Sequence, residues 1–184
     1  YWKRREADPA RRRILVSSIE HHAVEETCEW LQNTEGAVID WIPVDSQGLV
    51  DPESVRELIA QNPADVALVT VMWANNEVGT IQPIQDIAAI ASEYGIPMHT
   101  DAVQAFGQIP LFLEEMGIDL LSASAHKLHG PKGVGLLVIR KGVRLPAFLH
   151  GGAQERGFRA GTENVPGIVG FAAAAKEAFS TMEE

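Results

Sequence analysis

The sequence predicts an α/β protein built on a mostly parallel β-sheet with helices on both faces. Short apolar runs alternate with amphipathic segments of ten or more residues, which is the order of strands and helices in parallel sheets. The run 67–72 is continuously apolar, as expected of a strand buried on both faces. No linker or internal repeat divides the 184 residues, so we expect a single domain.

The first part of the chain contains three predicted strands and two predicted helices. The strands cover 13–18, 37–42 and 67–72, and the helices cover the segment around Cys28 and residues 51 to about 61. Asp51 suits the N-cap of the second helix because its carboxylate can accept from a free backbone N–H, and Pro52 suits the first helical position. Asn62-Pro63 then ends the helix.

The second part of the chain repeats this alternation. A helix is expected over 83–94, where Gly95 ends it. Three further strands are expected over 96–101, 120–124 and 134–139. A glycine-rich loop over 151–161 and a last helix over 165–181 follow.

Composition excludes several classes of function. The formal net charge of −10 argues against nucleic acid as a partner, because phosphates are neutralised by Lys and Arg. No apolar run approaches the length of a membrane span, and no signal peptide opens the chain, so we expect a cytoplasmic protein without membrane contact. Residues 1–13 carry six basic and two acidic side chains, which we interpret as a solvated helix end rather than an interaction arm.

Cys28 is the single cysteine, so an internal disulfide is impossible. Its neighbours are acidic, whereas a reactive thiolate needs an electropositive setting, and we therefore interpret it as a small buried residue. The six histidines are scattered without zinc-site spacing, so no metal site is expected.

Polar side chains follow three of the predicted strands. Asn75-Asn76 comes after the strand 67–72, Asp101 and Gln104 come at the end of 96–101, and Ser124-Ala125-His126-Lys127 comes at the end of 120–124. Ligands of parallel sheets bind beyond the carboxyl ends of the strands, so these groups are expected side by side.

This set of groups suits pyridoxal 5′-phosphate (PLP). Lys127 can form a Schiff base with an aldehyde, and Asp101 can pair with a protonated ring nitrogen, which keeps the ring an electron sink. The other members are neutral donors, suited to the phosphate (Ser124, His126) and the phenolic oxygen (Gln104, Asn76).

Each cluster also has a structural interpretation. Asp101 can cap a following helix, Asn75-Asn76 suits a turn, and 126–133 can form a solvated turn punctuated by Gly and Pro. Three chemically compatible clusters at successive strand ends favour the cofactor site over three unrelated turns.

The same residues carry a resemblance to a known family. The segment 122–133 resembles the PLP-lysine motif of the cysteine desulfurases, within the class V aminotransferases, and 75–79 and 101–104 match further cofactor motifs in the same order. The segment 19–24 resembles the one that carries the histidine stacked on the pyridine ring. The glycine-rich segment 151–164 resembles that of the subgroup serving iron–sulfur cluster assembly. The likeness spans nearly the whole chain.

The resemblance implies a role for each matching residue. Lys127 binds the cofactor covalently and later moves protons, and Asp101 pairs with the pyridine nitrogen. His21, rather than His22, stacks on the ring because the motif places the histidine directly after Glu20. Ser124 and His126 address the phosphate, and Gln104 and Asn76 the phenolic oxygen. Thr162 reaches the phosphate of a partner subunit, which implies a homodimer.

The implied fold is the large domain of the PLP transferases, fold type I, truncated at both ends. Residues 1–184 are then a partial PLP-binding large domain without the phosphate-loop segment that would precede it and the small C-terminal domain that would follow. The implied reaction takes sulfur from L-cysteine, giving L-alanine and an enzyme persulfide that passes sulfur to an acceptor such as a cluster scaffold. The family's persulfide cysteine and substrate-binding arginine fall outside this sequence, so we expect the 184 residues alone to be inactive.

Two alternatives remain at this point. A related class V enzyme, such as a selenocysteine lyase or an aminotransferase, is less favoured because of the loop 159–164. A non-catalytic sulfur-transfer scaffold is less favoured because it has no need of Lys127, Asp101 and His21.

Overall fold

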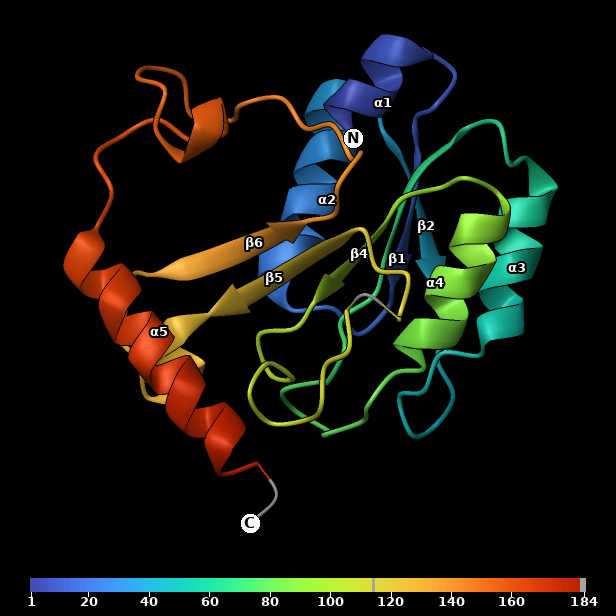
Figure 1. The fold of residues 1–184 in the computed structure, drawn as a ribbon. Coiled ribbons are helices and arrows are strands. Elements are labelled where there is room, and N and C mark those ends of the chain that lie inside the picture. Colours follow the sequence, from blue (N-terminus) through green and yellow to red (C-terminus); the bar gives the residue numbers. More distant parts are fainter. Residues whose placement is uncertain (114, 183–184) are drawn as a thin grey trace.

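A six-stranded sheet organises the computed structural model, which describes residues 1–113 and 115–182 (Figure 1). The strand order is β2-β1-β3-β4-β5-β6, with β1 to β5 parallel and β6 antiparallel to β5. The strands are β1 (Arg13–Ser17), β2 (Val38–Ile42), β3 (Val66–Thr70), β4 (Met98–Asp101), β5 (Leu120–Ser124) and β6 (Gly135–Ile139). The predicted mostly parallel sheet is confirmed. β6 runs antiparallel because the ten residues between it and β5 are too few for a helical crossover.

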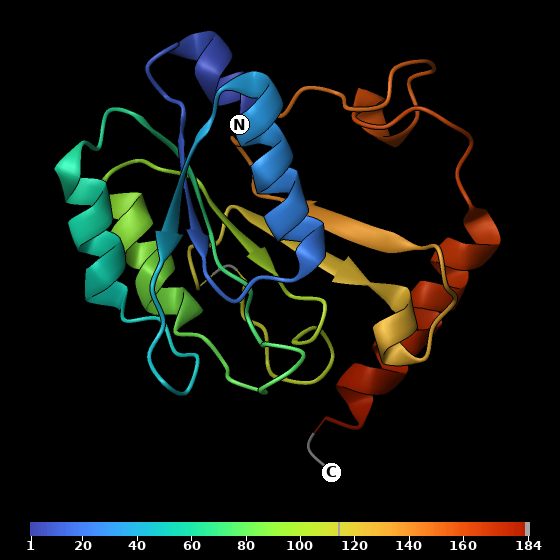
Figure 2. The same cartoon turned by 180° about the vertical axis from the view of Figure 1, so that it is seen from behind.

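Helices lie on both faces of the sheet, as predicted. α3 and α4 cover one face and α2 lies on the other, while α5 lies beside β5 and β6 (Figures 1 and 2). The α-helices are α1 (Trp2–Ala7), α2 (His22–Glu35), α3 (Pro52–Gln61), α4 (Ile84–Glu93) and α5 (Val165–Ser180), and short 3-10 turns form η1 (Ala125–Leu128) and η2 (Glu155–Gly157). None of the helices in the described ranges is both long and apolar enough to cross a bilayer.

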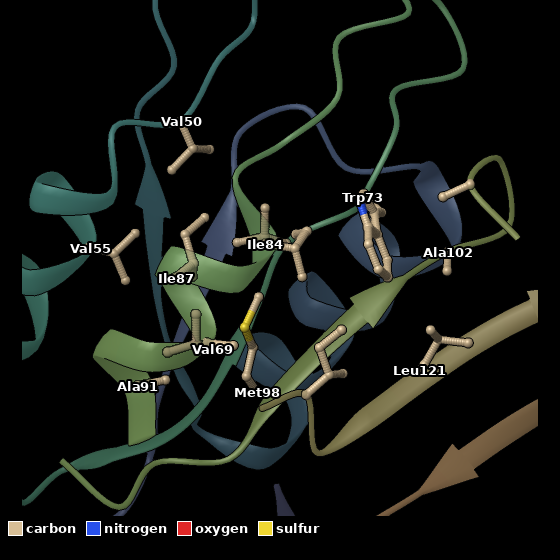
Figure 3. Packing of buried hydrophobic residues seen from close by; sticks show 14 of the residues in the cluster. Val50, Val55, Val69, Trp73, Ile84, Ile87, Ala91, Met98, Ala102 and Leu121 are labelled. Carbon is tan, nitrogen blue, oxygen red and sulfur yellow. The ribbon is translucent and has the colours of Figure 1, made fainter. Parts of the chain in front are cut away.

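The larger core fills the space between the sheet and the pair α3 and α4 (Figure 3). Val69, Met98 and Leu121 come from three neighbouring strands and are completely buried, as are Ile87 and Ala91 on α4. Burying each large aliphatic side chain contributes about 1.5–3 kcal/mol to folding. The central strands are therefore a rigid support for the loops that follow them.

A smaller core lies on the α2 face. Ile14 and Val16 of β1 pack there against Cys28 and Leu31 of α2. Cys28 is 5% exposed, and burial raises the pKa of its thiol to about 11, with a further contribution from the charge of Glu20. The side chain is thus a buried thiol, in agreement with its interpretation from the sequence.

The basic opening of the chain is less solvated than the sequence suggested. Arg5 donates a hydrogen bond to the Glu35 carbonyl at 2.7 Å, and Arg12 donates to the Gly36 carbonyl at 2.8 Å. Both acceptors belong to the C-terminus of α2, where carbonyl groups lack helical partners and cations are favourable. These two arginines therefore cap a helix.

Arg13 is the most deeply buried of the basic side chains in this segment, at 6% exposed. Its guanidinium donates to the carboxylates of Asp65 and Asp40 at 2.8 and 2.9 Å, and to the carbonyls of Leu58 and Asn62 at 3.0 and 3.2 Å. The side chain joins β1, β2 and the end of α3. A charge is tolerated at this depth because each of the three guanidinium nitrogens donates to an acceptor.

Candidate active site

The strand order places the predicted functional segments at one edge of the sheet. β3, β4 and β5 are parallel neighbours, and Asp101 stands opposite Ser122 in the register of β4 and β5. The backbone continues this contact beyond the strands, since the Trp73 N–H donates to the Asp101 carbonyl and the Ala102 N–H to the Ser122 carbonyl, both at 2.9 Å. The loops after the three strands therefore lie side by side.

The loop after β1 belongs to the same edge. Asn75, in the loop after β3, donates a hydrogen bond from Nδ2 to the Ile19 carbonyl at 2.9 Å. His21 follows as the N-cap of α2, where its Nδ1 accepts from the Ala23 N–H at 3.1 Å. His22 instead contacts Glu25 on the surface of the helix, with 3.0 Å between Nδ1 and Oε2. Of the two histidines, His21 is the one held at the loop.

Of the two asparagines after β3, Asn75 has a structural role and Asn76 is free to bind a ligand. Asn75 Oδ1 accepts from the backbone N–H groups of Glu77 and Val78, both at 2.9 Å, so this side chain shapes the turn. Asn76 is exposed and makes no side-chain hydrogen bond within the described residues. Its amide is thus available to a ligand, while its neighbour fixes the backbone.

Asp101 ends β4 and is 9% exposed. Its Oδ1 accepts from the Val103 N–H at 2.9 Å, as in an Asx turn, and its Oδ2 has no hydrogen-bond partner among the residues that the structure describes. Gln104 lies in the turn that follows and is half-buried. The carboxylate is therefore oriented through one oxygen and can accept from a cationic N–H through the other.

Lys127 lies on η1, directly after β5, and its amine is exposed without an ion pair inside the described ranges. The turn closes tightly behind it, because the Gly130 N–H donates to the Ala125 carbonyl at 2.9 Å. A Cβ on Gly130 would lie 2.8 Å from that carbonyl oxygen, so this position requires glycine. His129 has φ of 62°, which completes the reversal of the chain.

The two predicted phosphate donors meet on this turn. Ser124 Oγ and His126 Nδ1 are 2.7 Å apart, within hydrogen-bond distance. Both side chains are on the η1 segment or directly before it, close in sequence to Lys127. A neutral hydroxyl and imidazole have one proton each, and one of the two lies between Oγ and Nδ1, so the pair in contact offers one donor to an anionic group.

Thr162 is not brought to this edge. It is exposed and directly follows the glycine-rich loop, which is closed by backbone pairing between Leu149 and Arg159 and by a hydrogen bond from the Gly161 N–H to Gln154 Oε1 at 3.1 Å. In both views this loop lies at the opposite end of the molecule from the loops after β1, β3 and β4 (Figures 1 and 2). Its predicted action in a partner subunit stays a prediction.

Glu20 is a residue of the site to which the sequence alone assigned no role. Its Oε1 accepts from the Ser17 hydroxyl and from the Met72 N–H, each at 2.5 Å, so it joins the loop after β1 to the end of β3. Burial raises the pKa of this carboxyl to about 7; the two hydrogen bonds oppose the shift, and the charge of Asp101 adds to it. An acidic residue beside a predicted ring-stacking histidine was the signal available in the sequence.

Sequence reasoning also missed His99, which stands two residues before Asp101 on the same face of β4. Its Nδ1 lies 2.8 Å from Thr70 Oγ1 on β3, and its Nε2 lies 2.9 Å from Ser122 Oγ on β5. Burial lowers the pKa of the imidazole to about 4, against the smaller opposite effect of Asp101. The ring is therefore a neutral cross-strand bridge below the candidate site.

A broad groove of about 2040 Å³ opens on the α2 side of the sheet. It is lined by Thr70 and His99 of the sheet, by residues of α2 and β6, and by Thr162. Neither Lys127 nor Asp101 lines this groove. The candidate site at the strand ends is therefore separate from this groove.

The donor set at this edge fits PLP. Asp101 keeps one carboxylate oxygen for a ring nitrogen, Lys127 keeps an exposed amine for an aldehyde, and the hydrogen-bonded pair of Ser124 and His126 keeps a donor for a phosphate. The buried Oε2 of Glu20, which has no partner in the described residues, adds a polar atom beside the same loops.

Comparisons with known proteins point the same way. The family model described as "Aminotransferase class-V" matches residues 4–183. An "IscS-like cysteine desulfurase" from Mycobacterium tuberculosis is 48% identical over all 184 residues, which are 47% of that protein. A "Cysteine desulfurase IscS" from Methanosarcina thermophila is 53% identical over 171 residues, or 93% of this chain and 41% of that protein. The chain thus spans about half the length of the curated relatives it matches.

A solved structure titled "NIFS-LIKE PROTEIN" superposes with a TM-score of 0.90 at 46% identity, over 98% of this chain and 49% of that one. A second, titled "SspA in complex with cysteine", gives a TM-score of 0.87 at 40% identity, over 95% of this chain and 49% of that one.

Proposed function

The chain belongs to the aminotransferase class-V family, and on that premise we propose that it carries the cofactor-binding core of a PLP-dependent cysteine desulfurase. The observation that carries the proposal is the adjacency of the Asp101 and Lys127 segments, which end the neighbouring parallel strands β4 and β5. The similarity to named cysteine desulfurases at 48% and 53% identity supports the choice of reaction. We take residues 1–184 as part of a PLP-binding large domain.

Each residue at the edge has a task in binding this cofactor. PLP, when bound, supplies an electron sink that makes the α-carbon of an amino acid acidic. Asp101 Oδ2 would accept the ring N–H and so keep the ring nitrogen protonated, while the Val103 N–H holds Oδ1. The Lys127 amine would hold the cofactor through its aldehyde, and the same Nζ could take up or release a proton beside the bound amino acid.

The remaining predicted residues orient the ring and its substituents. His21 stacks on the ring face from the N-terminus of α2, and Ser124 with His126 donates to the phosphate. Asn76 and Gln104 donate to the phenolic oxygen and its surroundings, from the loops after β3 and β4.

L-Cysteine is the proposed substrate, supported by the neighbouring structure described as a complex with cysteine. A thiolate of the enzyme would take the sulfur as a persulfide, while the electron pair of the broken carbon–sulfur bond stays on carbon, which takes up a proton and leaves as L-alanine. Cys28 is unsuited to this thiolate role because it is 5% exposed and burial raises its pKa to about 11. We place the sulfur-accepting cysteine and the substrate-binding arginine in the part of the relatives' length that this chain does not match.

The proposed partners follow from the same assignment. Thr162 acts at the phosphate of a second subunit, which is consistent with the position of its loop far from the chain's own site, and makes the working enzyme a homodimer. The persulfide sulfur goes to an acceptor protein such as an iron–sulfur cluster scaffold, and the proposed location is the cytoplasm.

Reconstitution with PLP tests the cofactor assignment. The protein should develop a visible absorption band on addition of PLP, and borohydride should fix the cofactor on Lys127, as located by peptide mass mapping. Lys127→Ala should abolish both signals, because no amine remains for the aldehyde. Lys132→Ala is the matched control in the same exposed loop and should retain them. A band that survives in Lys127→Ala and disappears in Lys132→Ala contradicts the assignment.

Turnover by the whole protein tests the reaction. Alanine formation from L-cysteine should exceed both the reaction with selenocysteine and transamination of a keto acid. A clear preference for either of these would replace the desulfurase by a related class V enzyme.

A further inference from the structure

Glu20 holds a buried carboxyl group that the proposed function does not use. It lies in the loop after β1, one residue before the N-cap His21. Both hydrogen bonds to the carboxyl, from Ser17 and Met72, arrive at Oε1, whereas Oε2 is buried without a partner in the described residues. Ionisation would leave a buried, charged oxygen without a donor, and this costs more than a neutral O–H without an acceptor. The geometry therefore favours the neutral acid.

The surroundings of Glu20 connect four elements of the site. β1 contributes the Ser17 hydroxyl and β3 leads to the Met72 N–H. The titratable groups that exchange charge effects with Glu20 are Asp101 at the end of β4 and the Cys28 thiol of α2. Neither of these is a cation, so nothing among them stabilises an ionised Glu20.

We propose that Glu20 is a positioning residue. As a neutral acid it joins the His21 loop to the end of β3 and places no further negative charge near Asp101. The proposal rests on the proposed function in one respect, since it takes Asp101 as the partner of the PLP ring nitrogen. It adds a role in pH response to a residue to which the proposed function assigns no contact with the ring or the substrate.

The consequence is a pH-dependent step in the cofactor site. Because burial raises the pKa of Glu20 to about 7, its carboxylate forms near neutral pH. The new charge acts on Asp101 as Asp101 acts on it, because the interaction of two charges is mutual. A more negative environment strengthens the hold of Asp101 on a ring proton, so the electronic state of bound PLP changes as Glu20 ionises.

The first experiment uses the cofactor-free protein and is independent of the proposed function. A carbon-13 NMR titration of labelled glutamate carboxyls should show one resonance with a midpoint near 7, which Glu20→Gln removes and the exposed control Glu26→Gln retains. A Glu20 midpoint at the ordinary value of 4.5 overturns the proposal. If Glu20→Gln does not fold, Ser17→Ala decides. Loss of that hydrogen bond should raise the midpoint further, and an unchanged spectrum refutes the assignment.

The second experiment uses the PLP-loaded protein. The visible band of the wild-type protein should show a spectral step near pH 7 that Glu20→Gln lacks and Glu26→Gln keeps. Identical titrations of wild type and Glu20→Gln would show that Glu20 is a purely structural residue. Absence of any PLP band in the wild-type protein is the failure of the proposed function instead, and the carboxyl titration still tests the neutral state of Glu20.

Discussion

His99 gives the sharpest test of the electrostatics below the site. The imidazole bridges β3 and β5 through Thr70 and Ser122, and its burial lowers the pKa from 6.5 to about 4. Replacement by glutamine keeps a polar side chain of comparable reach but removes the group that titrates. The substitution therefore separates the pH response of His99 from its packing.

The size of the effect follows from the difference between the two pKa values. At 1.36 kcal/mol per pH unit, the interval from 6.5 to about 4 corresponds to about 3 kcal/mol in favour of the neutral ring. Part of the ring borders the open groove, so we expect about 2–3 kcal/mol. Between these pKa values the unfolded chain binds more protons at His99 than the folded chain. The contribution is therefore complete above about pH 6.5 and is lost as the pH falls toward 4.

Glu20 acts in the opposite direction over part of this range. Its folded-state pKa is raised from 4.5 to about 7, so its contribution is complete below 4.5 and is lost as the pH rises through 7. The stability curve of the wild-type protein alone can therefore look flat between pH 4.5 and 6.5. The difference between wild type and His99→Gln removes the Glu20 contribution, since both proteins contain it.

Urea unfolding of the cofactor-free proteins, followed by circular dichroism at several pH values between about 8 and 4, measures this difference. The stability advantage of wild type over His99→Gln at high pH should shrink by about 2–3 kcal/mol at the acid end. A difference that stays constant across the range would show that His99 titrates normally and would refute the argument from burial.

Two further substitutions test the scaffold that holds the site. Arg13→Met should lower the free energy of unfolding by about 3 kcal/mol. This value is at the lower end of the usual cost of breaking a buried ion pair, because the carboxylates of Asp40 and Asp65 are partly exposed to water. Urea unfolding should show a much smaller loss for the control Arg56→Met, whose ion pairs lie at the surface, and equal losses would contradict the structural role of Arg13. Gly130→Ala should weaken PLP binding about tenfold in a spectroscopic titration, because its Cβ would displace the Ala125 carbonyl next to the Lys127 turn, and unchanged affinity would show that the turn yields freely.

The fold was predictable because its signals are local. Apolar runs and the residues typical of helix ends located the six strands and the helices α3, α4 and α5 to within two residues. At α3, Asp51 caps the helix through the Glu53 N–H and Pro52 is its first residue. The antiparallel direction of β6 was not predicted, since strand direction depends on the connection and leaves no mark on the apolar pattern. Residues 1–13 were interpreted as a solvated helix end, whereas Arg5 and Arg12 cap the C-terminus of α2, far along the chain.

In the candidate site, too, the residues identified from the sequence are those with local signals, and the residues missed are those that depend on distant partners. Lys127, Asp101 and Asn76 were predictable because a polar residue directly after a buried strand must lie at the sheet edge, and parallel order makes successive edges adjacent. Glu20 and His99 escaped notice because their character depends on burial and on hydrogen bonds to other strands, contacts that no local pattern encodes.

Glu20 and His99, which the sequence did not identify, affect the electrostatic environment of Asp101. Asp101 must stay anionic to hold a ring proton, and a charged group close by on the sheet would compete with it. Burial lowers the pKa of His99 to about 4 and raises the pKa of Glu20 to about 7, so both side chains are neutral between these two values. Burial therefore leaves Asp101 as the dominant charge among these three groups, which is the condition its proposed task requires.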